Sequence, residues 1–266
     1  MRDYFKKIPE TIQQLIGPRP YYIDDIGMSS SQVICFDDMI LKIQECCEES
    51  ENELRMIKWL QRKLPVPRIL HEERADNTQF LLMSRILGQM SCDESYMDRE
   101  SVLIELLAQG LKMLWSVDIT DCPYSNSLEQ KLRQARGRVE QGLCDMENVQ
   151  EDTYGENGFR DPSDLLSWLE THKPQEDLVL AHGDYCLPNV FLQDDKISGF
   201  IDLGRCGIAD RYQDIALCYR SLLNNYQGAY GGKAYSAFHP ERLFEALEIK
   251  PDWEKVRYYI LLDELF

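Results

Sequence analysis

The sequence contains no apolar run that approaches the roughly 18 to 20 residues that a membrane-spanning helix needs. Its opening segment, MRDYFKKIPETIQQLIG, has charges scattered through it and no apolar core of the kind that a secretory signal carries. We also find no internal repeats and no low-complexity segment. These absences predict a globular protein that is cytoplasmic and has no membrane partner.

The cysteines lack the spacing that disulfides or metal sites require. There are nine, an odd number, with no CxxC pair among them, and Cys46 and Cys47 are adjacent. This pattern is typical of reduced thiols in a cytosolic protein, and it predicts neither a disulfide framework nor a zinc site.

Basic side chains are scarce relative to acidic ones. With 29 Lys and Arg against 46 Asp and Glu, the formal net charge is −17. That charge argues against nucleic acid as a partner, because phosphates need a positive surface, whereas it would concentrate a cationic partner around a cleft. Between positions 144 and 177, ten acidic residues stand against two basic ones. This acidic segment is either a solvated loop or the wall of a site for a cation.

What the sequence does contain predicts an α+β protein. Its first 85 residues show five strand-like segments and one helical segment, which predicts a small antiparallel five-stranded sheet with one helix laid on it. The strand-like segments cover 21–26, 32–36, 39–43, 68–73 and 79–84. Ser50 and Glu53 fit a capping box at the start of the helix, and Pro65 and Pro67 end it.

After the last of these strands the sequence becomes mainly helical. Apolar residues recur at helical spacing over 98–118, and the segments 127–143 and 162–171 and most of the last sixty residues are also helix-like. Two short strand-like segments, VLAHGD and GFIDL, lie among the helices. We therefore predict two lobes, residues 1–85 and a larger, mainly helical lobe of residues 86–266.

The stretch HGDYCLPN, followed later by IDLGR, carries the chemistry. Asp184 and Asn189 stand five residues apart, and Asp202 follows beyond a predicted hairpin. Amide and carboxylate oxygens suit Mg²⁺, which typically takes one or two carboxylates and leaves its other positions to water and phosphate. Asp184 can then accept the proton of an attacking hydroxyl, as in phosphoryl transfer. The order and spacing match the H-R-D-x-x-x-x-N and D-F-G motifs of protein kinases.

A kinase also needs a lysine on the small sheet that pairs with a helix glutamate and reaches the nucleotide phosphates. Lys42 lies in the strand-like MILKI, and Glu53 lies in the helix that follows. Glu53 also belongs to the predicted capping box, and the two roles can coexist. The loop at 27–31 could cover phosphates with its amides and hydroxyls, although it lacks the GxGxxG pattern.

Two other classes of protein share parts of this pattern. A metallohydrolase could use His182, Asp184 and Asp202, but the chain has only four histidines. A non-catalytic module could bind a nucleotide or a cationic ligand without reacting it, but the lysine, the base and both metal ligands are all present. Turnover that requires ATP would separate a kinase from both alternatives.

A resemblance to the catalytic core of the aminoglycoside phosphotransferases runs through LAHGDYCLPNVFLQDDKISGFIDLGRCGIADRYQDIALCYRSL. It extends through nearly the whole chain. A more specific similarity, to the 3′-phosphotransferases that act on kanamycin and neomycin, is carried by KLPVPRILHEE, LLMSRILG, VDITDCPYSNSLEQKL and KPDWEKVRYYILLDELF. The resemblance implies a bilobal, protein-kinase-like α+β fold, with the small five-stranded lobe binding nucleotide and the larger lobe holding the acceptor.

The same resemblance implies a role for each residue of the site. Asp184 is the catalytic base, and Asn189 and Asp202 hold magnesium. Lys42 contacts the α- and β-phosphates of ATP, and Glu53 steadies it. Ser29 is expected to contact the phosphates, and the segment from Met83 to Ile86 is expected to contact adenine. The residues expected to contact the aminoglycoside are Glu151, Glu156, Arg205, Asp263, Glu264 and Phe266.

The implied reaction is ATP- and Mg²⁺-dependent transfer of the γ-phosphoryl group to the 3′-hydroxyl of an aminoglycoside, which would confer antibiotic resistance. A cationic acceptor would explain both the acidic segment and the net charge of −17. The alternative is a small-molecule kinase of the same fold that acts on another cationic or amino-alcohol acceptor. We expect a monomer or a weak dimer, with no nucleic acid partner.

Overall fold

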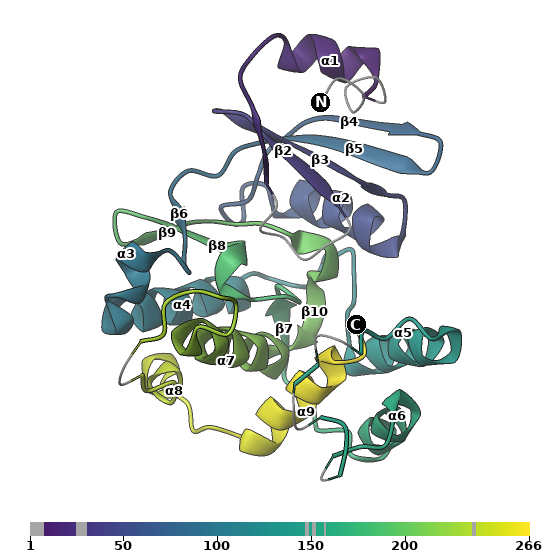
Figure 1. Ribbon diagram of the computed structural model, residues 1–266, viewed down its shortest axis with the longest axis vertical. Coiled ribbons are helices and arrows are strands. Elements are labelled where there is room, and N and C mark those ends of the chain that lie inside the picture. Colours follow the sequence, from purple (N-terminus) through teal and green to yellow (C-terminus); the bar gives the residue numbers. More distant parts are fainter. Residues whose placement is uncertain (1–7, 25–30, 147–148, 151–152, 157, 236–237) are drawn as a thin grey trace. The chain divides into compact units, whose positions relative to one another are not determined.

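The computed structural model describes the chain except for residues 1–7, 25–30, 147–148, 151–152, 157 and 236–237. The chain forms two compact units (Figure 1), of which unit 1 comprises residues 1–89 and 191–205, and unit 2 comprises residues 90–190 and 206–266. The predicted lobes were divided once, after residue 85. The structure differs because the segment 191–205 packs with the amino-terminal unit; the Phe200 N–H, for example, donates to the Pro65 carbonyl at 2.9 Å.

Unit 1 contains a five-stranded sheet of order β1-β2-β3-β5-β4, in which all neighbours pair antiparallel. The strands are β1 (Tyr22–Asp24), β2 (Gln32–Cys35), β3 (Met39–Glu45), β4 (Ile69–Ala75) and β5 (Thr78–Ser84). The predicted antiparallel sheet is thereby confirmed. Successive side chains of a strand point to opposite faces, so that β3 turns Leu41 to one face and Lys42 to the other.

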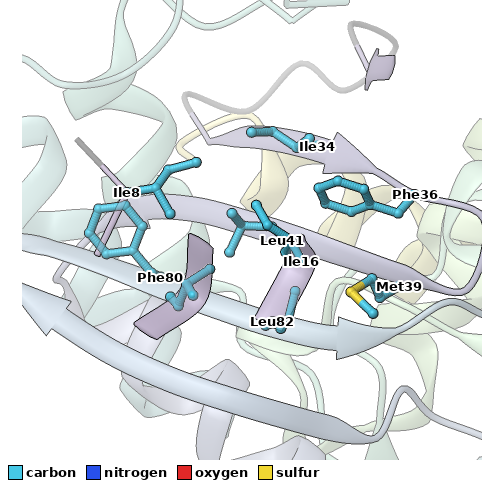
Figure 2. Packing of buried hydrophobic residues seen from close by; sticks show 9 residues of the cluster. Ile8, Ile16, Ile34, Phe36, Met39, Leu41, Phe80 and Leu82 are labelled. Atoms are coloured by element: carbon cyan, nitrogen blue, oxygen red, sulfur yellow. The ribbon is translucent and has the colours of Figure 1, made fainter. Parts of the chain in front are cut away.

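One face of this sheet packs against α1 (Glu10–Ile16), a helix that the sequence analysis missed. Ile8, Ile12 and Ile16 recur every fourth residue and join Leu41 in one buried cluster, as Figure 2 shows for three of the four. The prediction of one helix beside the sheet is therefore wrong. The isoleucine spacing was a signal, but a helix of 7 residues without a side-chain cap marks its start weakly.

The predicted helix is α2 (Glu48–Leu60), but its expected start is wrong. The N-cap is Cys47, whose backbone N–H donates to Ser50 Oγ at 2.9 Å, so that Ser50 is the third residue of the helix and not its cap. Glu53 consequently has no part in capping. It lies in the second turn with only 2% of its surface exposed.

A second sheet has the strand order β6-β8-β9, in which β8 and β9 form a tight hairpin. Its strands, with the 3₁₀ turn that comes after them, are β6 (Gln89–Met90), β8 (Val190–Gln193), β9 (Lys196–Phe200) and η3 (Leu203–Arg205). Asp194 and Asp195 join β8 to β9 with φ of 51° and 54°, which a type I′ turn requires. Gly88 has φ of 105°, and a Cβ there would lie 2.2 Å from the Leu192 carbonyl oxygen, so only glycine fits.

Unit 2 is mainly helical, as predicted. Its described elements are α3 (Glu94–Met97), α4 (Glu100–Trp115), α5 (Leu128–Gln141), α6 (Pro162–Thr171), β7 (Leu178–Ala181), η2 (Leu187–Asn189), β10 (Gly207–Asp210), α7 (Arg211–Gln227), α8 (Arg242–Leu247) and α9 (Trp253–Asp263). The helix expected over 98–118 corresponds to α4, with α3 as a separate turn before it. Among the described helices, none has the length and apolar character needed to cross a membrane.

The segment that follows α7, for which the sequence suggested no role, packs over the end of that helix. The ring of Tyr226 is 3% exposed and stacks on Phe238 with centroids 4.0 Å apart. Tyr235 packs against the same ring at 5.1 Å, and Lys233 Nζ lies 2.7 Å from Asp98 Oδ1. The described part of this segment therefore stabilises unit 2.

Candidate active site

In unit 1, a largely buried lysine on a strand contacts carboxylates from a helix and from the connection after β9. Lys42 Nζ on β3 lies 2.9 Å from both carboxylate oxygens of Glu53 on α2 and 2.8 Å from Asp202 Oδ1. The side chains of Lys42 and Glu53 are 12% and 2% exposed. Burial alone lowers the pKa of Lys42, but the charges of Glu53 and Asp202 outweigh it, so the pKa lies well above its ordinary value. The lysine therefore stays charged, as a phosphate-binding group must.

Polar neighbours fix Glu53 in this position. Gln44, two residues after Lys42 on the same face of β3, donates to Glu53 Oε2 at 2.8 Å and to Gln79 Oε1 at 3.0 Å. Gln79 is fully buried. A buried carboxylate needs such partners. The structure contains the pair of Lys42 and Glu53 that the sequence predicts.

Asp202 lies between the end of β9 and η3, in a connection that α2 holds in place. Its φ is 59°, a conformation that is uncommon for residues other than glycine, asparagine and aspartate. Asn52 Nδ2 of α2 donates to the Gly204 carbonyl at 2.9 Å, and a Cβ on Gly204 would lie 2.6 Å from Glu49 Cγ. The carboxylate of Asp202 remains 41% exposed while it contacts Lys42.

The other predicted residues of unit 1 have these positions. Met83 is buried on β5 as the partner of Ile40 and Ile69, whereas Ile86 lies just beyond the end of that strand. Arg205 Nε, expected to face the acceptor, lies 3.2 Å from Glu49 Oε1 of α2. Ser29 lies outside the described residues, as does Glu151.

In unit 2, a fully buried aspartate supports the HGD turn. The carboxylate of Asp214 on α7 accepts the backbone N–H groups of His182 at 2.6 Å and Gly183 at 2.9 Å, and Gly183 has φ of 86°. Burial raises the pKa of Asp214, and the hydrogen bonds from the His182 and Gly183 N–H groups oppose that rise. The sequence analysis missed this residue, although an aspartate within the apolar run of a helix was a usable signal.

The carboxylate of Asp184 is held from both sides. Asn189 Nδ2 donates to Asp184 Oδ2 at 2.9 Å and to its backbone carbonyl at 3.0 Å, and the thiol of Cys186 donates to Asp184 Oδ1 at 3.0 Å. Burial raises the pKa of the Cys186 thiol well above its ordinary value, so the thiol keeps its proton. The structure therefore brings the predicted base and one predicted metal ligand together, and it adds Cys186, which the sequence analysis missed.

The carboxylates of Asp263 and Glu264 also lie in unit 2, beside Arg220, which the sequence analysis did not single out. Arg220 on α7 pairs with Asp263, and its Nη1 lies 3.7 Å from Glu264 Oε1. The Gln150 N–H, from the acidic segment, donates to Glu264 Oε2 at 3.3 Å. Burial raises the pKa of Glu264, and the Arg220 charge opposes the rise. Glu156 lies exposed in a turn of the same acidic segment.

Phe266 is held by two cations of α5. Arg138 donates to the Leu265 carbonyl at 2.8 Å and to the Phe266 carbonyl at 2.7 Å. Lys131 Nζ lies 5.1 Å from the centre of the Phe266 ring, within the range of a cation–π contact. The position of the last four residues is thus set by side chains from α5 and α7.

Comparison with known proteins gives matches along nearly the whole chain. The sequence profile of the phosphotransferase enzyme family matches residues 27–259. An aminoglycoside 3′-phosphotransferase of Enterococcus faecalis is 47% identical over 98% of this chain and 98% of its own length. One from Staphylococcus aureus is 40% identical, again over 98% of both chains.

Solved structures share the fold. An aminoglycoside phosphotransferase of Streptomyces rimosus superposes with a TM-score of 0.81 at 24% identity, covering 100% of this chain and 99% of that one. The same enzyme in complex with ADP and streptomycin superposes with a TM-score of 0.78 at 24% identity, over 96% of this chain and 95% of that one. The fold expected from the sequence is therefore confirmed.

Proposed function

As a member of the phosphotransferase enzyme family that stands among the aminoglycoside 3′-phosphotransferases, this chain is a kinase, and we propose that it phosphorylates the 3′-hydroxyl of an aminoglycoside such as kanamycin. The observation that carries the proposal is the full-length similarity to several enzymes of that name, at 38% to 47% identity. The site residues described above support it, since they are the groups that phosphoryl transfer requires.

Unit 1 supplies the nucleotide contacts in this proposal. Lys42, already oriented by Glu53, binds the α- and β-phosphates of ATP, with Ser29 covering the phosphates and the segment from Met83 to Ile86 contacting adenine. Nucleotide binding accords with the ADP complex of the related Streptomyces rimosus enzyme. Because Lys42 also contacts Asp202 at 2.8 Å, ATP would compete for the ammonium and release the carboxylate.

Asn189 and Asp202 fit a magnesium ion by their chemistry. Both offer hard oxygen donors, and a metal ion would take the amide oxygen of Asn189, because the amide nitrogen is already engaged with Asp184. When bound, the ion would neutralise charge on the β- and γ-phosphates. Asp202 is suited to receive it, since its carboxylate is 41% exposed.

Asp184 performs the proton transfer. As the acceptor oxygen bonds to the γ-phosphorus and the bond from that phosphorus to the ADP oxygen breaks, the hydroxyl proton passes to Asp184. Cys186 and Asn189 keep the carboxylate oriented through their hydrogen bonds to its two oxygens. Such a base is typically worth about 10² to 10⁴ in rate.

The acceptor is held by negative charge. In the proposal, Glu151, Glu156, Asp263 and Glu264 face the ammonium groups of the aminoglycoside, and Phe266 completes this part of the site. One charge pair at about 4 Å is worth ~1 kcal/mol in water and ~4 kcal/mol where it is partly shielded. Several such pairs give useful affinity without a deep apolar pocket.

An ADP-release assay with ATP and Mg²⁺ tests the function, with kanamycin compared against tobramycin, which lacks the 3′-hydroxyl. Turnover of kanamycin alone is the expected result. Turnover of both would place the phosphate on another hydroxyl. Turnover of neither, with ATP still bound, would favour the alternative acceptor, another cationic or amino-alcohol metabolite.

Loss of the Asp184 carboxylate should affect turnover and leave nucleotide binding nearly unchanged. Asp184→Ala should lower kcat by about 10² to 10⁴ while the Kd for a nucleotide analogue stays within about twofold, because nucleotide contacts are proposed for unit 1. Both quantities can be measured on one preparation by the coupled assay and by calorimetry. Substantial turnover in this variant would refute the assignment of Asp184 as base.

A further inference from the structure

Arg220, Asp263 and Glu264 form a largely buried charged cluster in unit 2. Their side chains are 17%, 13% and 4% exposed. One guanidinium nitrogen of Arg220 pairs with Asp263, and the other lies 3.7 Å from Glu264 Oε1. Arg220 comes from α7, and the two carboxylates come from the end of the neighbouring α9, which Figure 1 shows beside α7.

The cluster carries an excess of negative charge. Two ionised carboxylates and one guanidinium sum to a net charge of −1, away from bulk water. A buried carboxylate without a cation takes up a proton more readily. Glu264 already shows this tendency, since burial raises its pKa, and the charge of Arg220 is the largest influence that opposes the rise. The charge of Arg220 therefore favours the ionised form of Glu264.

Helix α7 also ties this cluster to the catalytic loop. Ser221, the next residue after Arg220, accepts the Leu187 N–H at 3.0 Å through its Oγ. The charge of Arg220 also acts on the thiol of Cys186, which donates to Asp184. One turn of α7 thus supports both the loop that carries the base and the carboxylates near residue 264.

We propose that Arg220 is a positioning residue of the acceptor site, which holds Asp263 and Glu264 in fixed, ionised positions so that the cluster receives one ammonium group of the acceptor. This inference rests on the proposed function, in which the two carboxylates bind the aminoglycoside. Arg220 itself does not touch the acceptor.

A rival role for Arg220 predicts the opposite sign. If the guanidinium merely competed with the acceptor for the carboxylates, its removal would leave a net charge of −2 and would tighten the binding of a cation. In the positioning role, its removal lets the buried carboxylates take up protons or separate, and acceptor binding weakens. The direction of the change in affinity therefore distinguishes the two roles.

The experiment compares Arg220→Met and Arg220→Lys with wild type, with Arg211→Met as a matched control. Arg211 opens the same helix, and its Nε pairs with Asp177 at 2.7 Å, so its loss removes an ion pair of α7 outside the cluster. For each protein we would measure the Kd for kanamycin by calorimetry, kcat, the KM values for kanamycin and ATP, and the melting temperature.

The expected result is a rise of at least about tenfold in the Kd and KM for kanamycin with Arg220→Met, equivalent to about 1.4 kcal/mol. The KM for ATP should change by less than about twofold, and Arg220→Lys should recover part of the loss by restoring the charge. The control should leave the kanamycin values near those of wild type.

Three outcomes would overturn the proposal. Tighter or unchanged kanamycin binding in Arg220→Met would exclude positioning. Equal loss for ATP and kanamycin, with a lowered melting temperature, would show a structural role only, as would the same loss in Arg211→Met. Wild type that binds kanamycin without phosphorylating it would overturn the proposed function instead, and the calorimetric comparison would still decide the role of Arg220.

Discussion

Asp184 has a hydrogen-bond donor on each carboxylate oxygen, Cys186 at 3.0 Å and Asn189 at 2.9 Å. A carboxylate held from both sides keeps one orientation, which lowers the entropy lost when the reacting groups are brought together. The contribution of Cys186 depends on its proton, because a thiolate cannot donate. Burial keeps that proton in place by raising the pKa of the thiol.

This protonation state can be measured by alkylation. A raised thiol pKa leaves little thiolate at neutral pH, so Cys186 should react slowly with iodoacetamide, and its rate should still be rising with pH above about pH 9. Cys47, which is exposed, serves as the internal reference. Peptide mass spectrometry gives both rates in one sample, and a plateau for Cys186 near neutral pH would contradict the protonated donor.

The candidate residues of the site were predictable to the extent that they belong to short motifs. Asp184, Asn189 and Asp202 follow from spacing alone, and Lys42 with Glu53 follows from the order of strand and helix. The supporting groups were not predictable in this way. Asp214 stands out as an aspartate within an apolar run, but Asp214 and Arg220 act through contacts with segments 32 and 43 residues away along the chain, and no local pattern indicates those partners.

At the scale of elements, α2 serves two functions that the sequence analysis had assigned to one residue. Its start is fixed by Cys47 and Ser50, while Glu53, in the second turn, pairs with Lys42. Cysteine is not among the common N-cap residues, so the sequence pattern favours the serine three positions later as the cap. The existence of the helix was predictable, whereas its start depended on a backbone contact of a serine.

The close approach of Gly88 to β8 gives a prediction for one connection. Gly88→Ala should destabilise the protein by more than about 1 kcal/mol, because alanine resists a positive φ and its Cβ would meet the Leu192 carbonyl at 2.2 Å. Urea unfolding measures the change.

Gly232→Ala is the control for that experiment, since a Cβ on Gly232 has no heavy atom within 4 Å. The control should alter the free energy of unfolding by no more than about 0.5 kcal/mol. If both variants unfolded at the same urea concentration as wild type, the close approach of Gly88 to β8 would not exist in solution.

At the scale of the whole molecule, the net charge of −17 gives a long-range field that attracts cations. This attraction is screened by salt, with a Debye length of about 10 Å at 0.1 M ionic strength and about 30 Å at 0.01 M. It acts before contact, on the approach of the acceptor. Composition alone, without any knowledge of the fold, therefore predicts that salt slows the association of a cationic acceptor.

Raising the salt concentration should lower kcat/KM for kanamycin by about tenfold or more between 0.01 M and 0.3 M ionic strength. The value of kcat at saturating kanamycin should change far less, because the field acts on encounter. Steady-state assays in potassium chloride at fixed Mg²⁺ and ATP measure both. A kcat/KM that does not depend on salt would show that the acceptor is not steered by charge.

The fold class and the order of most elements were predictable from hydrophobic periodicity, but the division into units was not. Periodicity shows which face of a segment is buried, but it does not show which distant segment packs against that face. The hairpin β8–β9 has the sequence of an ordinary strand pair. Only its contacts, such as that between Lys42 and Asp202, 160 residues apart, assign it to unit 1.

Residues 90–190 separate the two segments of unit 1 along the chain, and this affects synthesis on the ribosome. Lys42 and Glu53 emerge early, but the aspartate that completes their charge network emerges only after residues 90–190. At about 5 to 20 residues per second, synthesis of residues 90–190 alone takes roughly 5 to 20 s. During that time the nascent amino-terminal unit lacks its last hairpin, so a chaperone that binds unfinished sheets has its longest opportunity between the emergence of β6 and that of β9.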